Sequence, residues 1–297
     1  MSTPEVTPGV RLHAFVPLAH ERLPLEESHL RGAAFHAHMN RRRTTRQFSS
    51  EPVPRELIEQ FARREVEGRY RSSFLGGLWS IVTPILMLAI FTFVFGVVFK
   101  ARWARATDDS LAGFALVLFS GLTTFHIFSE TVARAPSLIV GVPNYVKKVV
   151  LQVEVLPVSL IGAALFHAAI SYGVLLVAIV LITGVLHWTV VLLPAVILPV
   201  ALYALGLSWF LASLGVFVRD ISNLIALLLQ ALLFLTPIFY DLATLSEPLQ
   251  SLVRLNPLAI LVDDARKVLV YGVVPEFGPL AIATASGSVV ALLGFAW

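Results

Sequence analysis

Long apolar stretches alternate with short polar segments from residue 75 to the end of the chain. A helix needs roughly 20 apolar residues to cross the hydrocarbon core of a bilayer. Single prolines and glycines inside such a stretch are tolerated, because neighbouring helices satisfy the freed backbone groups. The pattern predicts an all-α membrane protein with six transmembrane helices, at residues 75–99, 111–132, 155–185, 190–216, 221–240 and 278–297.

Composition and charge exclude a soluble fold for most of the chain. Residues 1–75 contain 12 of the 22 Lys and Arg residues and 9 of the 19 Asp and Glu residues, so residues 76–297 contain only ten of each kind. A soluble domain carries about 25% charged residues, which cover its surface. The chain has no cysteine, so it is not a disulfide scaffold either.

The distribution of Lys and Arg predicts the orientation of the spans. With the N-terminus inside, the inner segments 1–74, 133–154 and 217–220 carry 16 Lys and Arg residues, and the outer segments carry six. Positive residues concentrate on the cytoplasmic side of membrane proteins. We therefore expect a cytoplasmic N-terminus and, with an even number of spans, a cytoplasmic C-terminus.

Two cytoplasmic segments next to the spans are amphipathic. Residues 63–76 place arginines on one side of a helix and apolar residues on the other, which suits a helix lying in the membrane interface. The same segment could be a flank that only fixes topology. Residues 142–153, between the second and third spans, could be a plain connector or the contact through which a soluble partner moves the spans.

The outer segment 241–277 is long for a connector between two spans. It contains a short apolar piece followed by charged residues, which is typical of an interfacial or re-entrant element. We expect one or two short helices within residues 249–271, broken at Asn256 and Pro257.

Motifs for catalysis are absent from the sequence. There is no G-x-x-x-x-G-K-[ST] loop for ATP and no zinc-binding pattern. His167 is the histidine that lies well inside a predicted span, where it could serve function or form a helix–helix hydrogen bond. The acidic residues lie at span ends and form no proton relay, so we expect a non-enzymatic subunit that receives energy from a partner.

Five pieces of the sequence resemble permease subunits of ABC exporters that move O-antigen or teichoic-acid polymers, in the order and spacing of that family. The resemblance covers residues 62–275. The pieces are RREVEGRYRSSFLGGLWSIVTPILML (63–88), VPNYVKKVVLQVEVLPV (142–158), LASLGVFVRDISN (211–223), FLTPIFY (234–240) and LNPLAILVDDARKVLVYG (255–272).

The resemblance implies a type-2 ABC transporter transmembrane domain over residues 62–297, with an N-terminal interface helix and short outer gate helices between spans five and six. It implies a homodimer of permeases in the inner (cytoplasmic) membrane, with two copies of a separate ABC ATPase. That ATPase would bind ATP and Mg, so this chain needs no cofactor of its own. The cargo would be a lipid-linked polysaccharide, and no nucleic acid is involved.

The same resemblance suggests roles for individual residues. The interface helix would include Arg64, Arg69, Tyr70 and Arg71. Contacts with the ATPase would involve Asn144, Lys147, Lys148, Glu154, Arg219 and Asp220. Candidates for the pore or its outer gate are Phe91, Phe95, Phe125, Phe128, Phe239, Tyr240, Asn256, Pro257 and Arg266. Aromatic rings suit a sliding glycan because sugar C–H faces stack on them, although phenylalanines in spans also face lipid.

The first 61 residues differ from this pattern. Residues 41–61 are similar to the opening of nitroreductase-family flavoproteins, where arginines grip the FMN phosphate, but the remainder of that fold is missing. We expect residues 1–61 to be an atypical leader without function. The apolar end at Trp297 also suggests a truncated C-terminus. Alternatives to the polysaccharide exporter are a drug or lipid permease of the same architecture, a membrane-anchored flavin reductase and a scaffold without transport.

Overall fold

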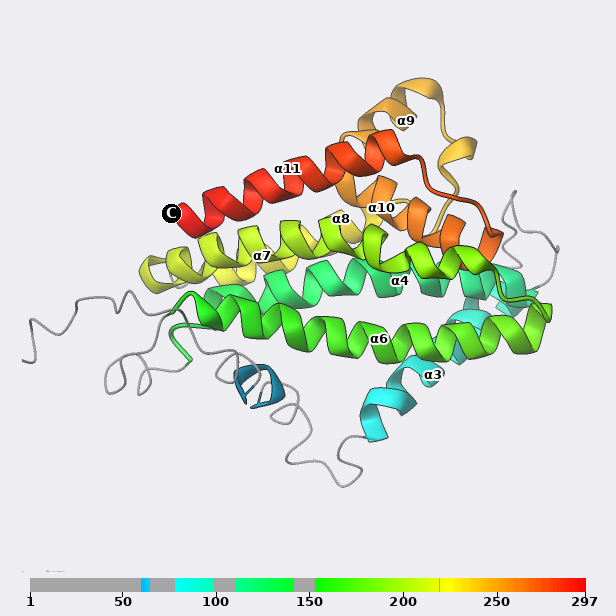
Figure 1. The fold of residues 1–297 in the computed structure, drawn as a ribbon, viewed down its shortest axis with the longest axis horizontal. Coiled ribbons are helices and arrows are strands. Elements are labelled where there is room, and N and C mark those ends of the chain that lie inside the picture. The colour runs from blue at the N-terminus through cyan, green and yellow to red at the C-terminus, as the bar shows by residue number, and fades with distance from the viewer. Residues whose placement is uncertain (1–59, 65–77, 99–110, 142–152, 219) are drawn as a thin grey trace, which may run out of the picture. The chain divides into compact units, whose positions relative to one another are not determined.

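The computed structural model describes residues 60–64, 78–98, 111–141, 153–218 and 220–297 (Figure 1). Within these ranges the chain forms helices and turns and no strand, as the sequence predicts. The long helices are α3 (Trp79–Phe91), α4 (Leu111–Arg134), α6 (Val155–Thr183), α7 (Leu193–Phe217), α8 (Ile221–Leu235) and α11 (Phe277–Ala296). The short elements are η2 (Thr92–Val98), η3 (Ala135–Ser137), η4 (Trp188–Leu192), η5 (Leu242–Thr244), α9 (Glu247–Arg254), α10 (Pro257–Arg266) and η6 (Lys267–Tyr271).

Four helical segments of the described chain are long and apolar enough to cross a membrane. They are Ala112–Ser137, Val155–Thr183, Trp188–Phe217 and Phe277–Ala296. The predicted first and fifth spans coincide with shorter apolar helices at Trp79–Val94 and Ile221–Leu235. The multi-pass helical architecture is therefore confirmed, and the full count of six spans stays a prediction.

Helix α4 forms the centre of the described bundle. It packs against α3, α6, α7, α8 and α10, so that 78% of its most apolar window is buried. The hydroxyls of Ser120, Thr124 and Thr131 donate to backbone carbonyls three or four residues earlier in the same helix. A helix that is mostly apolar and whose hydroxyls bond to its own backbone can be surrounded by other helices.

Helices α7 and α11 pack closely because small residues lie between them. Ala283, Gly287 and Ala291 recur every four residues along α11 and are buried. A Cβ added at Gly206 of α7 would overlap the backbone of Val290, and one added at Gly294 would overlap the backbone of Gly206. Small residues of this kind let two membrane helices approach backbone to backbone.

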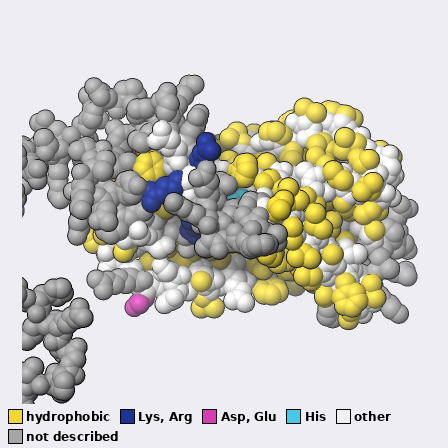
Figure 2. Space-filling model, turned by 90° about the horizontal axis from the view of Figure 1, so that it is seen from below, with side chains coloured by type: hydrophobic (Ala, Val, Ile, Leu, Met, Phe, Trp, Pro, Cys, Tyr) yellow, Lys and Arg dark blue, Asp and Glu magenta, His cyan; other side chains and the backbone are white. Residues whose placement is uncertain are grey.

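The outward faces of the helices are strongly hydrophobic. Figure 2 shows one face on which apolar side chains gather in large patches. Leu181, Phe217 and Ile282 are 80%, 81% and 71% exposed. Large apolar side chains exposed to this extent are expected of helices that face lipid, not water.

Short elements pack against the long helices or against each other at both ends of the bundle. At one end η3 packs on the C-terminal part of α7, and the indole N–H of Trp209 on α7 donates to the backbone carbonyl of Glu154 at 3.0 Å. At the other end the hydroxyl of Thr189 in η4 donates to the carbonyl of Val268 in η6 at 2.7 Å. The turn between α6 and α7 is thereby attached to the outer segment that the sequence predicts.

Candidate functional site

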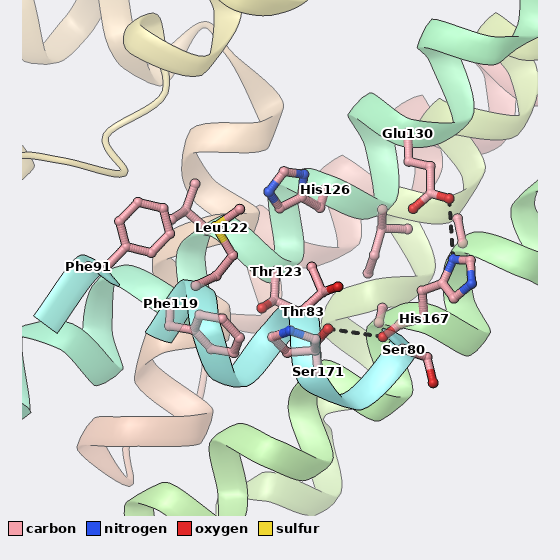
Figure 3. Close-up of a pocket in the computed structure, with 15 residues that line it drawn as sticks. Ser80, Thr83, Phe91, Phe119, Leu122, Thr123, His126, Glu130, His167 and Ser171 are labelled. Atoms are coloured by element: carbon pink, nitrogen blue, oxygen red, sulfur yellow. Dashed lines mark hydrogen bonds and ion pairs between the residues drawn. The ribbon is translucent and has the colours of Figure 1, made fainter. Parts of the chain in front are cut away.

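A cavity of about 330 Å³ lies between α3, α4 and α6. Its lining combines apolar and polar side chains from the three helices (Figure 3). The lining residues are Ser80, Thr83, Pro84, Met87 and Phe91 of α3, Phe119, Leu122, Thr123, His126, Ile127 and Glu130 of α4, and Ala164, His167, Ala168 and Ser171 of α6.

The helical repeat explains why these residues meet. Positions three and four apart share one face of a helix. On α4 the lining positions run from Phe119 to Glu130 at this spacing, and on α6 they run from Ala164 to Ser171 in the same way. Each helix therefore turns one continuous stripe toward the cavity.

A side-chain hydrogen bond links two of the three helices at the cavity. The Nδ1 of His167 lies 3.2 Å from Oε1 of Glu130, and the two side chains are only 12% and 17% exposed. The hydroxyl of Ser171 donates to the carbonyl of His167 at 3.0 Å. His167 therefore forms the helix–helix hydrogen bond that the sequence analysis considered for it. The partner of His167 in this bond is Glu130, which lies at the end of a predicted span.

The cavity has chemically different ends. Phe91, Phe119 and Leu122 lie together at one end in Figure 3, whereas Glu130 and His167 lie at the other. Thr83, Thr123 and His126 lie between them. An apolar surface beside convergent hydrogen-bonding groups is the usual composition of a small-molecule site.

A second polar site is built around the buried side chain of Arg266, which is only 1% exposed. Its Nε donates to the carbonyl of Val117 on α4 at 3.3 Å. Its two terminal nitrogens donate to the carbonyls of Pro237 at 2.6 Å and Ile238 at 2.8 Å. Arg266 therefore joins α10, α4 and the segment after α8.

Burial shifts the pKa values of Arg266 and of its neighbour Asp264. Burial lowers the pKa of Arg266 to about 10, which leaves the guanidinium charged at neutral pH. The neighbouring Asp264 is almost fully buried, and this burial raises the pKa of its carboxyl despite a 2.9 Å hydrogen bond from Lys267. Lys267 also lies 3.2 Å from Asp263, so both carboxylates hold its ammonium.

The outer helices begin where the sequence predicts a break. Asn256 caps α10: its side-chain oxygen accepts the N–H of Leu258 at 3.0 Å, and Pro257 takes the first helical position. The side-chain nitrogen of Asn256 donates to the hydroxyl of Thr236 at 3.0 Å. The cap therefore also attaches α10 to the end of α8, while the gate role of these helices stays a prediction.

The predicted pore residues occupy different environments. Phe125 and Phe128 are buried in the core of the chain, and Phe91 lines the cavity. Phe239 packs beside Phe234, with ring centres 5.8 Å apart. The half-exposed Tyr240 donates toward the last carbonyls of α8 at 3.3 and 3.4 Å. Phe95 belongs to η2, and its side chain lies outside the described part of the structure.

Few of the predicted interface and coupling residues lie in the described ranges. Arg64 is exposed on a helical stretch over residues 60–64. Glu154 and Asp220 immediately precede α6 and α8. The others lie outside the described residues: Arg69, Tyr70, Arg71, Asn144, Lys147, Lys148 and Arg219.

Sequence reasoning missed the cavity as a site. Thr83, Thr123 and His126 were not among the predicted residues, although they lie on stripes with helical spacing. The available signal was the repetition of polar positions inside apolar helices, such as Thr123, His126 and Glu130 on α4. Only the packing of three separate helices shows that these stripes converge.

Comparison with known proteins identifies the family. The model of the ABC-2 type transporter family matches residues 56–270, so the chain belongs to this family. It is similar to the O-antigen export system permease protein RfbA of Myxococcus xanthus, with 31% identity over 240 residues, or 80% of this chain and 89% of the relative. Two proteins of the same name from Klebsiella pneumoniae are each 23% identical over 80–81% of the chain and 89–90% of their own length.

The chain is therefore a multi-pass ABC-2 permease homologous to O-antigen export permeases. Membership of this family implies work together with an ABC ATPase. The resemblance that the sequence pieces suggested is confirmed.

Proposed function

We propose that this protein is the transmembrane subunit of an ATP-driven exporter that moves a lipid-linked polysaccharide across the inner (cytoplasmic) membrane. The observation that carries the proposal is the similarity to O-antigen export permeases over 80% of the chain. In this proposal two permeases form a homodimer, and two copies of a separate ABC ATPase bind ATP and Mg.

The inner ends of the helices supply the proposed contact with the ATPase. The residues before α6 are linked to α7 by the hydrogen bond from Trp209 to Glu154, and η3 packs on both α7 and α8. A push transmitted to the start of α6 would therefore reach α7 through this contact. The predicted coupling positions Glu154 and Asp220 lie at the starts of α6 and α8.

The test is co-purification with a candidate ATPase from the same genome, followed by measurement of ATP hydrolysis and export. Because the family match begins at residue 56, we expect the full chain and a chain lacking residues 1–50 to capture the ATPase equally. Inside-out vesicles containing the complex should move added lipid-linked glycan into a glycosidase-protected lumen when ATP is supplied.

Three results would contradict the proposal. A full chain that captures no ABC ATPase would not be an exporter subunit of this kind. ATP hydrolysis stimulated by small drugs or phospholipid, and not by lipid-linked glycan, would favour the alternative permease. A purified protein that is yellow and contains flavin would instead favour the reductase.

A further inference from the structure

We propose that the cavity between α3, α4 and α6 binds a short stretch of sugar units of the exported glycan. Polar side chains would hydrogen-bond to sugar hydroxyls, and the aromatic end would contact the apolar face of a sugar ring. This inference rests on the proposed export of a lipid-linked polysaccharide. It concerns a cavity within one protomer.

The polar content of the lining points to a polar ligand. Seven of the fifteen lining residues carry polar side chains: Ser80, Thr83, Thr123, His126, Glu130, His167 and Ser171. Polar side chains at membrane depth cost free energy unless they have partners, and they mark functional sites. An acyl chain forms no hydrogen bond with any of these groups, whereas a ligand that carries hydroxyls can bond to all of them.

Sugar hydroxyls fit this set of groups better than an anion does. A hydroxyl both donates and accepts, and so can pair with carboxylate, imidazole and threonine hydroxyl alike. The carboxylate of Glu130 at the polar end would repel a phosphate or pyrophosphate group. Phe91 and Phe119 at the opposite end supply aromatic surface for the C–H face of a ring.

The dimensions suit a short part of a glycan. The volume of about 330 Å³ is at the lower end of the range for ligand pockets. Phe119 and Glu130 are eleven residues apart on α4, so the lined stripe extends over about 16 Å along that helix. Thr83 and Met87 on α3 are exposed at the same time as they line the cavity, so a ligand can reach it from that side.

The methionine content of the chain permits a selective test. The three methionines are Met1, Met39 and Met87, and Met87 is the one inside the family-matched region. Cells grown with photo-methionine, a diazirine analogue, would carry one photoreactive group at the cavity. In a control chain with Met87→Leu and Leu86→Met, that group moves to an exposed neighbour that does not line the cavity.

Illumination of cells that synthesise the lipid-linked glycan should yield a glycan adduct on the peptide containing residue 87, identified by mass spectrometry. The control chain should give at most background glycan adduct and instead capture phospholipid. Equal glycan capture by both chains, or phospholipid alone at residue 87, would overturn the proposal.

A second variant tests the hydrogen bonding itself. Thr123→Val removes a hydroxyl from the lining without changing side-chain volume, and we expect about tenfold less glycan adduct at residue 87. Thr284→Val on α11 is the matched control, because that hydroxyl bonds to the carbonyl of Leu280 away from the cavity. Equal losses in both variants would contradict a specific sugar contact.

Export measured in the same cells separates the two proposals. Intact export without a glycan adduct at residue 87 overturns the sugar site and leaves the permease function standing. Loss of export together with failure to capture an ATPase in the unmodified chain overturns the proposed function itself.

Discussion

At the scale of single residues, Arg266 is the largest fully buried side chain of the described structure. Its guanidinium is buried and charged, and it donates to three backbone carbonyls on two other segments. Bonds from a charged donor are stronger than neutral ones, and a buried group left without them carries its full desolvation cost. The residue therefore holds the outer helix α10 against α4.

We expect Arg266→Met to destabilise the protein by about 3–5 kcal/mol, because the carbonyls of Pro237 and Ile238 each lose their buried donor at a cost of about 1–3 kcal/mol. Arg266→Lys should recover only part of the loss, since a single ammonium cannot reproduce the geometry of the guanidinium. Thermal unfolding of the purified protein in detergent measures both changes. Arg254→Lys on the exposed side of α9 is the control, and a similar loss there would refute the assignment.

Gly121 on α4 provides the space that Arg266 needs. A Cβ at this position would lie 2.9 Å from a terminal nitrogen of Arg266 and 3.1 Å from Cγ1 of Val262. That nitrogen is fixed by its bond to Ile238, so the side chain cannot simply move away. No such constraint exists at Gly173 on α6, where a Cβ meets nothing within 4 Å.

We expect Gly121→Ala to cost about 1–3 kcal/mol through overpacking, whereas Gly173→Ala should gain up to about 1 kcal/mol of helix propensity. Combining Gly121→Ala with Arg266→Met should cost less than the sum of the two changes, because the blocking nitrogen is gone. A strictly additive double variant would show that the two residues are not coupled.

At the scale of elements, the packing of α7 on α11 depends on glycines. The two backbones touch at Gly206 and Gly294, and the hydroxyls of Tyr203 and Ser286 are hydrogen-bonded at 2.5 Å nearby. The Ser286 hydroxyl also bonds to its own helix, so this contact orients the two helices in a fixed register.

Gly206→Ala should therefore force α7 and α11 apart and lower stability by at least about 1–3 kcal/mol. The apparent melting temperature and the yield of folded protein from membranes report this loss. Gly278→Ala near the start of α11 is the matched change, because a Cβ there has open space. A loss at Gly278 equal to that at Gly206 would mean that α11 tolerates no substitution, whatever its contacts.

At the scale of the whole molecule, labelling can measure directly which side of the membrane each end of the helices faces. Ser137 in η3 and Ser251 in α9 are both exposed, and each hydroxyl bonds only to a carbonyl three or four residues earlier. The sequence contains no cysteine, so a single introduced thiol is a unique label.

We expect Ser251→Cys to react with a membrane-impermeant maleimide added outside intact spheroplasts, and Ser137→Cys to react only after permeabilisation. This follows from the excess of Lys and Arg on the inner segments. The cysteine-free parent chain controls for background labelling. The reverse pattern of labelling would show that the predicted orientation of the chain in the membrane is wrong.

Sequence reasoning reached the helical membrane architecture and the family, and it located the break at Asn256 and Pro257. These features depend on local properties: length of apolar runs, a capping side chain and the fixed φ of proline. It proposed Arg266 as a gate candidate without indicating its buried carbonyl partners, because these lie 28, 29 and 149 residues away in the chain.

The sequence by itself determined that the protein lies in the membrane, since a helix satisfies its own backbone and the apolar runs require lipid around them. Only the tertiary structure decided which helix is central and which polar side chains converge. The interiors of α4 and α6 are both apolar, yet 78% of the most apolar window of α4 is buried, compared with 22% of that of α6. Burial and cavities arise from contacts among several helices, and the periodicity of one helix carries no information about its partners.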